Sequence, residues 1–65
     1  MKPLTTPLTG SELRTIRKRL NLSQGELGDM LGKTQATVSR FENGTTIPRD
    51  TAIAVRAIAR EAETE

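Results

Sequence analysis

The sequence predicts an all-α protein, a single compact bundle of four helices. Three observations support this fold class. Apolar residues recur at helical spacing in successive segments, Ser or Thr with Glu three residues later opens two of these segments, and Gly, Asn or Pro separates them. The chain has 65 residues and no cysteine, so packed aliphatic side chains must hold one small domain together without disulfides.

The folded domain is expected over residues 9–62. Residues 1–8 contain two prolines and no helical period, which predicts a flexible N-terminal arm. Residues 63–65 are expected to form a frayed acidic tail. No apolar run is long enough for a signal peptide or a membrane span, so we expect a cytoplasmic protein.

Capping boxes open the first two predicted helices. Thr9 pairs with Glu12 and Ser23 pairs with Glu26, a spacing at which each side chain can bond the other residue's backbone N–H. Apolar stripes follow the two boxes, at Leu13, Ile16 and Leu20 and at Leu27, Met30 and Leu31. Gly32 is expected to end the second helix, because glycine accepts the left-handed conformation common at helix ends.

A cap and a proline indicate the two remaining helices. Thr34 can cap a third helix over about residues 34–43, which Asn43 and Gly44 end. The inward residues of this helix are Val38 and Phe41. Pro48 suits the first turn of a helix, so a fourth helix is expected over about residues 49–61.

The turn between the second and third helices is very short. Two helices joined in this way are predicted to cross at about 90–120°, the geometry of a helix-turn-helix. Gly28 lies one turn into the second helix and would let the two helices approach closely. The alternative interpretation of Gly28 is a glycine that weakens its helix by about 1 kcal/mol.

Together these residues resemble the Cro and phage-repressor type of helix-turn-helix, the lambda-repressor-like XRE family. The resemblance covers about residues 13–58 and rests on the motifs Leu22–Gly28, Leu31–Gly32, Thr34–Ser39, Phe41–Gly44 and Pro48. It implies a bundle of four or five helices that binds a palindromic operator as a homodimer and represses transcription, as in phages and mobile elements. The sequence departs from the family at Gly28, where alanine is usual, and a fifth helix would be very short.

Short polar side chains are predicted on the outer face of the third helix. Because a helix turns about 100° per residue, the face opposite Val38 and Phe41 holds the candidate base-reading residues Gln35, Ala36, Ser39 and Arg40. Glutamine can pair with adenine and arginine with guanine, while a methyl group packs on thymine. The alternative is a solvated surface, but such a face usually carries several Glu and Lys. Arg40 has two interpretations, a guanine contact or a phosphate contact.

Phosphate contacts are predicted around the third helix. The candidates are Ser23, Gln24, Thr34, Thr37, Asn43, Thr46, Arg49 and Arg17. The resemblance implies that Gln24 contacts a phosphate and also bonds Gln35, and that Asn43 and Thr46 donate to phosphate. Structural alternatives exist, since Thr34 is first a cap, Thr37 lies near the core, and Arg49 can simply be solvated.

The resemblance also implies an ion pair between Arg17 and Glu42, which would tie the first helix to the third. The structural role of Arg17 is preferred over its role as a DNA contact.

The fourth helix is apolar over more than half of its circumference, which indicates burial on two sides. The second side is predicted to form a homodimer interface at Ile47, Ile53 and Ala57. The alternative is that all these residues close one thin core.

The charge is unevenly distributed along the chain. Residues 1–49 carry eight Lys and Arg against four acidic residues, net +4, whereas residues 50–65 have a net charge of −2. A basic body suits a polyanion and predicts DNA binding with a steep salt dependence. A mixed solvated surface is the alternative.

Enzymatic activity is not expected. The chain has no histidine and no cysteine, and its few carboxylates are scattered over helix surfaces. No cofactor, metal or small-molecule ligand is expected either. The rival function is a protein-interaction module or antitoxin of the same fold, and a polar outer face on the third helix favours DNA over a protein partner.

Overall fold

The computed structural model describes residues 7–63, which form four helices and no strand. They are α1 (Gly10–Arg19), α2 (Gln24–Leu31), α3 (Gln35–Glu42) and α4 (Arg49–Glu63). The predicted all-α class and the order of the helices are confirmed. α4 extends two residues beyond its predicted end, so Glu63 belongs to the helix and not to a tail. None of the helices in the described range is long and apolar enough to cross a membrane.

Both predicted capping boxes are present. The Thr9 hydroxyl accepts from the Glu12 N–H at 3.1 Å, and the Glu12 carboxylate accepts from the Thr9 N–H at 3.1 Å. The reciprocal bonds between Ser23 and Glu26 measure 2.8 and 3.0 Å. Each box satisfies two N–H groups that would otherwise lack a partner at a helix start, so local sequence determines where α1 and α2 begin.

One hydrogen-bond pattern ends the first three helices. A residue with positive φ follows each of them, with values of 59° at Asn21, 70° at Gly32 and 115° at Gly44. After α2, Gly32 donates to the carbonyl three residues earlier at 3.3 Å, and Lys33 donates to the carbonyl five residues earlier at 2.7 Å. The same pair of bonds follows α1 and α3, which is the pattern of the Schellman motif. The predicted ends at Gly32 and Gly44 are confirmed.

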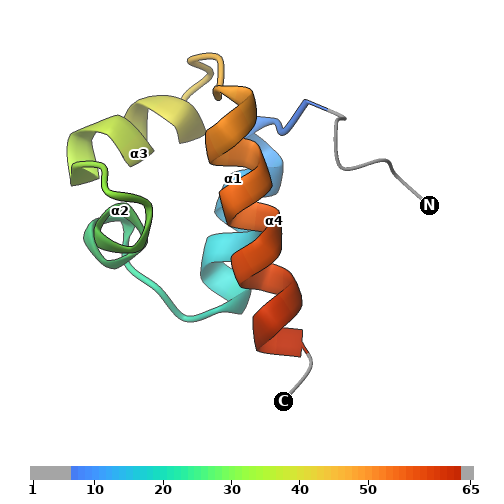
Figure 1. Cartoon of the computed structure of the whole chain (residues 1–65). Helices are drawn as coiled ribbons and strands as arrows, with labels where there is room; N and C mark the ends of the chain where they lie inside the picture. Colours follow the sequence, from blue (N-terminus) through green and yellow to red (C-terminus); the bar gives the residue numbers. More distant parts are fainter. Residues whose placement is uncertain (1–6, 64–65) are drawn as a thin grey trace.

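The core lies where the four helices face one another. Its buried apolar residues are Leu8, Leu13, Leu27, Val38, Phe41, Ile47, Ala52 and Val55. In Figure 1, α2 is seen along its axis while α3 runs across the view, so the two helices cross as the short turn predicted. α4 closes the core from the other side and lies in front of α1 in this view.

Two core residues correct the sequence-based predictions. Leu8 was placed in the arm, but it is 5% exposed and packs in the core, so the folded part begins before Thr9. Residues 1–6 of the predicted arm and residues 64–65 of the predicted tail lie outside the described range. Ile47 was placed at a dimer interface, but it is 8% exposed, because its side chain completes the core ahead of α4.

Gly28 has the packing role that the sequence suggested. A Cβ atom at this position would lie 2.8 Å from the Lys33 carbonyl oxygen and 3.2 Å from that of Thr34. Gly25 differs, since a Cβ there would meet only the Ser23 hydroxyl at 3.9 Å. The absence of a side chain at Gly28 therefore lets the start of α3 pack directly on α2.

Candidate nucleic-acid interface

The outer face of α3 is polar and open to ligands. Val38 is fully buried and Phe41 is 6% exposed, so the opposite face of the helix points away from the core. Gln35, Ala36 and Arg40 are exposed on that side and Ser39 is half-buried. Within residues 7–63, the side chains of Gln35 and Arg40 form no hydrogen bond or ion pair. Their donors are therefore free for a ligand.

The start of α3 carries two adjacent hydroxyl groups. The Thr34 hydroxyl oxygen caps the helix by accepting from the Thr37 N–H at 3.2 Å, and it lies 3.0 Å from the Thr37 hydroxyl. One of these two hydroxyls donates to the other, which leaves a single O–H proton that can donate to an external acceptor. The capping role of Thr34 is thus compatible with a phosphate contact.

The start of α2 carries two further candidate donors. Ser23 caps α2 as an acceptor, so its own hydroxyl proton remains free. The Gln24 amide nitrogen donates to the Glu42 carboxylate at 3.2 Å. The predicted bond between Gln24 and Gln35 is not formed within residues 7–63 of this structure, where the amide bonds a charged carboxylate, which is a stronger acceptor than a neutral amide oxygen. Its second N–H proton is still available.

The predicted ion pair between Arg17 and Glu42 is present. The Arg17 Nε donates to one carboxylate oxygen at 2.6 Å and Nη2 donates to the other at 3.1 Å. The Arg17 Nη1 donates to the Leu22 carbonyl at 3.0 Å. With side chains only 13% and 6% exposed, this bidentate pair ties α1 and the turn after it to the end of α3.

The environment of this pair favours its charged form. Burial alone would raise the pKa of Glu42, but hydrogen bonds from Arg17 and Gln24 and the positive charges of Arg17 and Arg14 outweigh it. The pKa of Glu42 therefore lies below its ordinary value. The hydrogen bond to Glu42 likewise raises the pKa of Arg17, against the opposing effect of burial.

The remaining predicted phosphate contacts lie after α3. The Asn43 amide nitrogen donates to the Ser39 carbonyl at 2.8 Å and more weakly to the Ser39 hydroxyl at 3.5 Å, so this side chain caps the end of α3. Thr46 and Arg49 are exposed. Arg49 is the first residue of α4, where the positive end of the helix dipole adds to its charge.

Two contacts that hold α3 in place were not predicted from the sequence. The Leu22 carbonyl accepts a hydrogen bond from Arg17, and a backbone acceptor of this kind cannot be predicted from the pattern of side chains. Gly10 begins α1, and a Cβ there would lie 2.9 Å from the Glu42 carbonyl oxygen and closer still to that of Phe41. A glycine directly after a capping residue was the only available signal.

A family model described as helix-turn-helix matches residues 13–55, from the first buried residue of α1 into α4. The chain belongs to the helix-turn-helix family. The match includes α2, the turn and α3, which are the elements that carry the polar face described above. In the helix-turn-helix motif the second helix is called the recognition helix, and α3 is the second helix of the motif in this chain.

Two similar proteins carry names that class them as candidate HTH-type transcriptional regulatory proteins. The chain is 35% identical over 48 residues to one from Methanoregula boonei and 33% identical over 51 residues to one from Methanosphaerula palustris. The alignments include 74% and 78% of this helix-turn-helix chain but only 15% and 17% of these relatives. No solved structure matches the chain significantly.

Proposed function

We propose that this protein binds double-stranded DNA sequence-specifically and regulates transcription, with α3 in the major groove. The observation that carries this proposal is the polar outer face of α3, where Gln35 and Arg40 have no partner within residues 7–63. Family membership and the names of the relatives support a DNA-binding regulator and not an enzyme.

The base contacts follow from the chemistry of this face. Gln35 lies at the first turn of α3, the end that goes deepest in this motif, and pairs with an adenine. The Ala36 methyl group packs on a thymine methyl, and the Ser39 hydroxyl bonds a neighbouring base edge. Arg40 either pairs with a guanine or clamps a phosphate, and the two roles have different mutational signatures.

Phosphate contacts surround this face. The proposed set is Ser23, Gln24, Thr34, Thr37, Asn43, Thr46 and Arg49. The N-termini of α2 and α4 add their backbone dipoles to these donors. We leave Arg17 out of the set, because three of its N–H groups are already bonded within the chain and its side chain is 13% exposed.

We also propose that the protein binds an inverted repeat as a homodimer and acts as a repressor or autoregulator. The free apolar residues on α4, Ile53 and Ala57, support a two-fold contact. A symmetric pair of reading helices requires half-sites separated by about one helical turn of DNA, roughly 34 Å. Occupancy of such an operator would exclude polymerase from an overlapping promoter.

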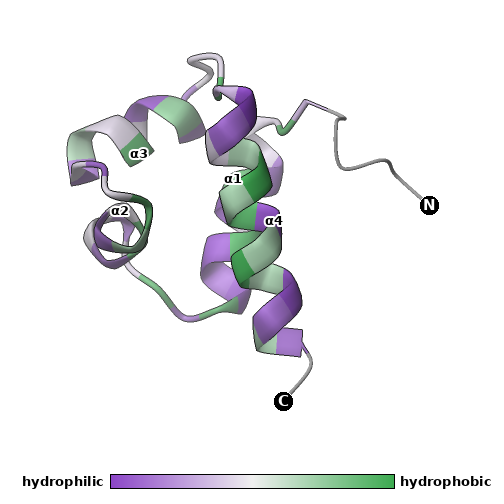
Figure 2. Cartoon of the chain, viewed as in Figure 1, coloured by the Kyte–Doolittle hydropathy of each residue, from purple (hydrophilic) through white to green (hydrophobic). Residues whose placement is uncertain are grey.

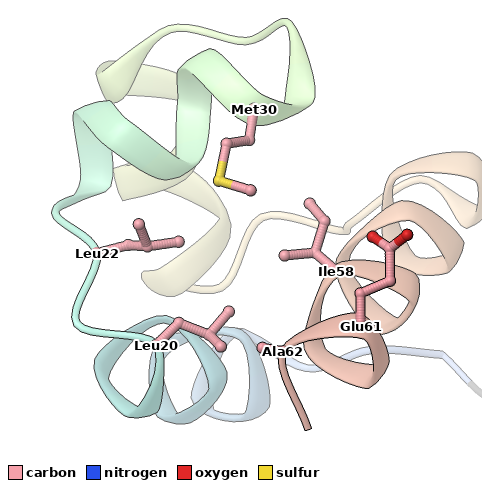
Figure 3. Close-up of a pocket in the computed structure, with 6 residues that line it drawn as sticks. All are labelled: Leu20, Leu22, Met30, Ile58, Glu61 and Ala62. Carbon is pink, nitrogen blue, oxygen red and sulfur yellow. The ribbon is translucent and has the colours of Figure 1, made fainter. Parts of the chain in front are cut away.

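One feature favours a second candidate function, a protein-interaction module such as an antitoxin. An apolar groove of about 330 Å³ opens between α1, α2 and α4, where the side chains of Leu20, Leu22, Met30 and Ile58 converge (Figure 3). Met30 is 54% exposed there. No residue of α3 lines the groove, and its lining residues on α4 lie in the C-terminal half of that helix. The outer face of α3 carries no apolar side chain larger than that of Ala36. A protein partner in the groove would leave α3 free.

The test begins with selection of bound sequences from a random pool of duplex DNA. Gln35→Ala should then weaken binding to the selected site by about 1–3 kcal/mol and relax the choice at one base pair. Arg40→Ala should do the same at a G·C pair if it reads a base, or weaken all sequences alike if it clamps phosphate. The measurement is the ratio of each variant's affinity for the selected site to its affinity for a scrambled site. An unchanged ratio for Gln35→Ala would contradict the proposal, as would selection that returns no preferred sequence.

A further inference from the structure

Asn43 and Gly44 form an Asn-Gly pair at the exposed end of α3. Residues 43–46 are all exposed, and the next buried side chain is that of Ile47. In Figure 2 the loop between α3 and α4 stands out from the helices and is hydrophilic to neutral over most of its length. A Cβ atom placed on Gly44 would meet nothing within 4 Å. Solvent therefore reaches the backbone of this pair.

An asparagine followed by glycine can react with its own backbone, because glycine has no side chain to crowd the attacking nitrogen. The Gly44 nitrogen attacks the Asn43 side-chain carbonyl carbon, a C–N bond forms, and the side-chain amide leaves as ammonia with the proton of the Gly44 N–H. Water then opens the five-membered succinimide at either carbonyl. One opening gives aspartate, and the other gives isoaspartate, in which the backbone continues through the side chain. The net reaction consumes one water and releases one ammonia.

The fold requires a glycine at this place. Gly44 has a φ of 115°, a conformation that residues with a side chain rarely adopt, and this conformation ends α3. The residue that ends the helix is thus also the residue that least hinders attack on Asn43. The other asparagine in the chain, Asn21, is followed by Leu22, whose side chain crowds the attacking nitrogen.

The folded geometry keeps the reacting atoms apart. The ψ of Asn43 is 8°, which places the Gly44 nitrogen on the side of the Asn43 backbone nitrogen and not on the side of Cβ, where ring closure needs it. The Gly44 N–H also donates to the Phe41 carbonyl at 3.2 Å, and the Asn43 amide donates to the Ser39 carbonyl at 2.8 Å. The reaction must therefore wait until the last turn of α3 opens locally.

The products are incompatible with the proposed role of Asn43. Aspartate has no side-chain N–H, so it loses both the cap on the Ser39 carbonyl and the proposed phosphate contact. Its negative charge lies next to Glu42 at the C-terminal end of α3, where the helix dipole is also negative. Isoaspartate in addition lengthens the backbone by one carbon inside the turn that the bond from Gly44 to Phe41 closes.

We propose that Asn43 is a site of spontaneous deamidation that inactivates the DNA-free form of this protein. Bound DNA slows the reaction, because a phosphate at the end of α3 favours the closed turn over the opened one. The chemical step depends on this chain alone, whereas its effect on DNA binding rests on the proposed function. Deamidation thus limits the lifetime of free copies and spares those on an operator.

Tandem mass spectrometry of the aged protein locates the conversion. In warm, mildly alkaline buffer, aspartate and isoaspartate should accumulate at residue 43 several-fold faster than at Asn21, the internal control. The rate at residue 43 should rise further in guanidinium chloride, where the hydrogen bonds of the turn are lost. No conversion at residue 43, or equal rates at the two asparagines, would overturn the inference. An equal rate in denaturant would overturn the protective role of the turn.

Matched variants test the effect on binding. Asn43→Asp should weaken binding to the selected operator by about tenfold or more, because it removes a hydrogen bond to a charged group and adds a like charge. Asn21→Asp adds the same charge after α1 and should bind as the wild type does. Thermal melting checks that both variants are folded. Undiminished operator binding by Asn43→Asp, or by aged protein converted at residue 43, would overturn the inference.

Asn43→Gln separates ageing from the loss of a contact. It keeps an amide but would have to close a six-membered ring, which is far slower, so its affinity should stay constant during incubation. The active fraction of the wild type should fall in step with conversion at residue 43. A wild type that loses activity no faster than Asn43→Gln would contradict the proposal.

DNA protection distinguishes failure of this inference from failure of the proposed function. The selected operator should slow conversion at residue 43 several-fold, and a scrambled duplex should protect less. An operator that leaves the rate unchanged would overturn the protection by DNA. Specific binding of a selected site without conversion at Asn43 would remove this inference and leave DNA reading by α3 intact. Absence of any preferred DNA sequence would remove the proposed function, while conversion measured by mass would still stand.

Discussion

At the last turn of α3, Glu42 accepts hydrogen bonds from residues of two other helices. Arg17 reaches it from α1 with two nitrogens, and Gln24 reaches it from α2. The Glu42 side chain is 6% exposed, so removal of its charge would leave the Arg17 guanidinium nearly buried without its counter-ion. Leaving one partner of such a pair behind is far more costly than the net stabilisation that the intact pair provides.

We expect Glu42→Gln to lower the free energy of unfolding by about 2 kcal/mol at neutral pH. The loss should depend on pH, because the pKa of Glu42 is lowered in the folded state. Such a carboxyl stabilises the fold above its unfolded pKa of about 4.3, and this contribution disappears as the pH falls through the lower folded value. The two proteins should therefore become equally stable in acid. Urea unfolding between neutral pH and about pH 3 measures the difference.

Glu26→Gln is the matched control for this measurement. Glu26 is exposed, and glutamine also serves at this position of a capping box. The same chemical change should therefore have little effect on stability. If Glu42→Gln were as mild as Glu26→Gln at neutral pH, the ion pair would not be the link between α1 and α3 that its geometry indicates.

At the scale of elements, the two glycines of α2 are predicted to respond in opposite ways to alanine. Gly25→Ala should raise the free energy of unfolding by about 0.5–1 kcal/mol, because alanine favours the helix and meets no close neighbour there. Gly28→Ala should lower it by about 1–3 kcal/mol, because the new methyl group would push the Lys33 and Thr34 backbone away from α2. Chemical denaturation of the two single variants gives the comparison.

The two glycine variants are also expected to differ in their affinity for DNA. Movement of Thr34 would also move Gln35, so Gly28→Ala should weaken binding to the selected operator while Gly25→Ala leaves it unchanged. Equal stability and equal affinity of the two variants would show that the turn after α2 relaxes freely.

The starts and ends of the helices were predictable because their causes are local. The capping boxes at Thr9 and Ser23 and the turns at Gly32 and Gly44 each involve residues a few positions apart. Asn21 was recognised only as a break in the pattern, although its φ of 59° gives it the same role as the two glycines. Asparagine tolerates this conformation better than most residues, which was the missed signal.

The predictions that differ from the structure concern residues whose contacts depend on segments distant in the sequence. Leu8 and Ile47 flank helices in the sequence, and periodicity does not reveal which flanking residues complete a core. Gln24 could bond several partners, and only the folded position of Glu42 decides among them. The ion pair between Arg17 and Glu42 was predicted by resemblance to a family, since no local pattern links residues so far apart in the sequence.

For the whole molecule, the proposed DNA contacts are mostly neutral. Among the residues proposed to contact phosphate, Arg49 carries a charge, and Arg40 adds a second one if it clamps a phosphate. Only cationic groups release counter-ions from DNA, whereas hydroxyl and amide donors add affinity without changing the salt dependence. The salt dependence of binding should therefore come from a few arginine and lysine side chains and not from the number of contacts.

Arg49→Ala should weaken binding to all sequences alike and reduce the slope of log affinity against log salt by about 0.9 per protomer. Thr46→Val is the comparison, because it removes a neutral donor from the same exposed segment. It should weaken binding at every salt concentration with no change of slope. Titrations between low and moderate salt measure both slopes. A wild-type affinity that does not change with salt would exclude phosphate contacts by charged side chains.

The link between three helices at Glu42 also bears on the heat of DNA binding. Because Arg17 and Gln24 already tie α1 and α2 to the end of α3 in the free protein, the proposed reading surface needs little ordering when it meets DNA. Binding without coupled folding changes the heat capacity only through the surface that the contact itself buries. Calorimetric binding curves of this protein should therefore resemble those of a rigid body docking on DNA.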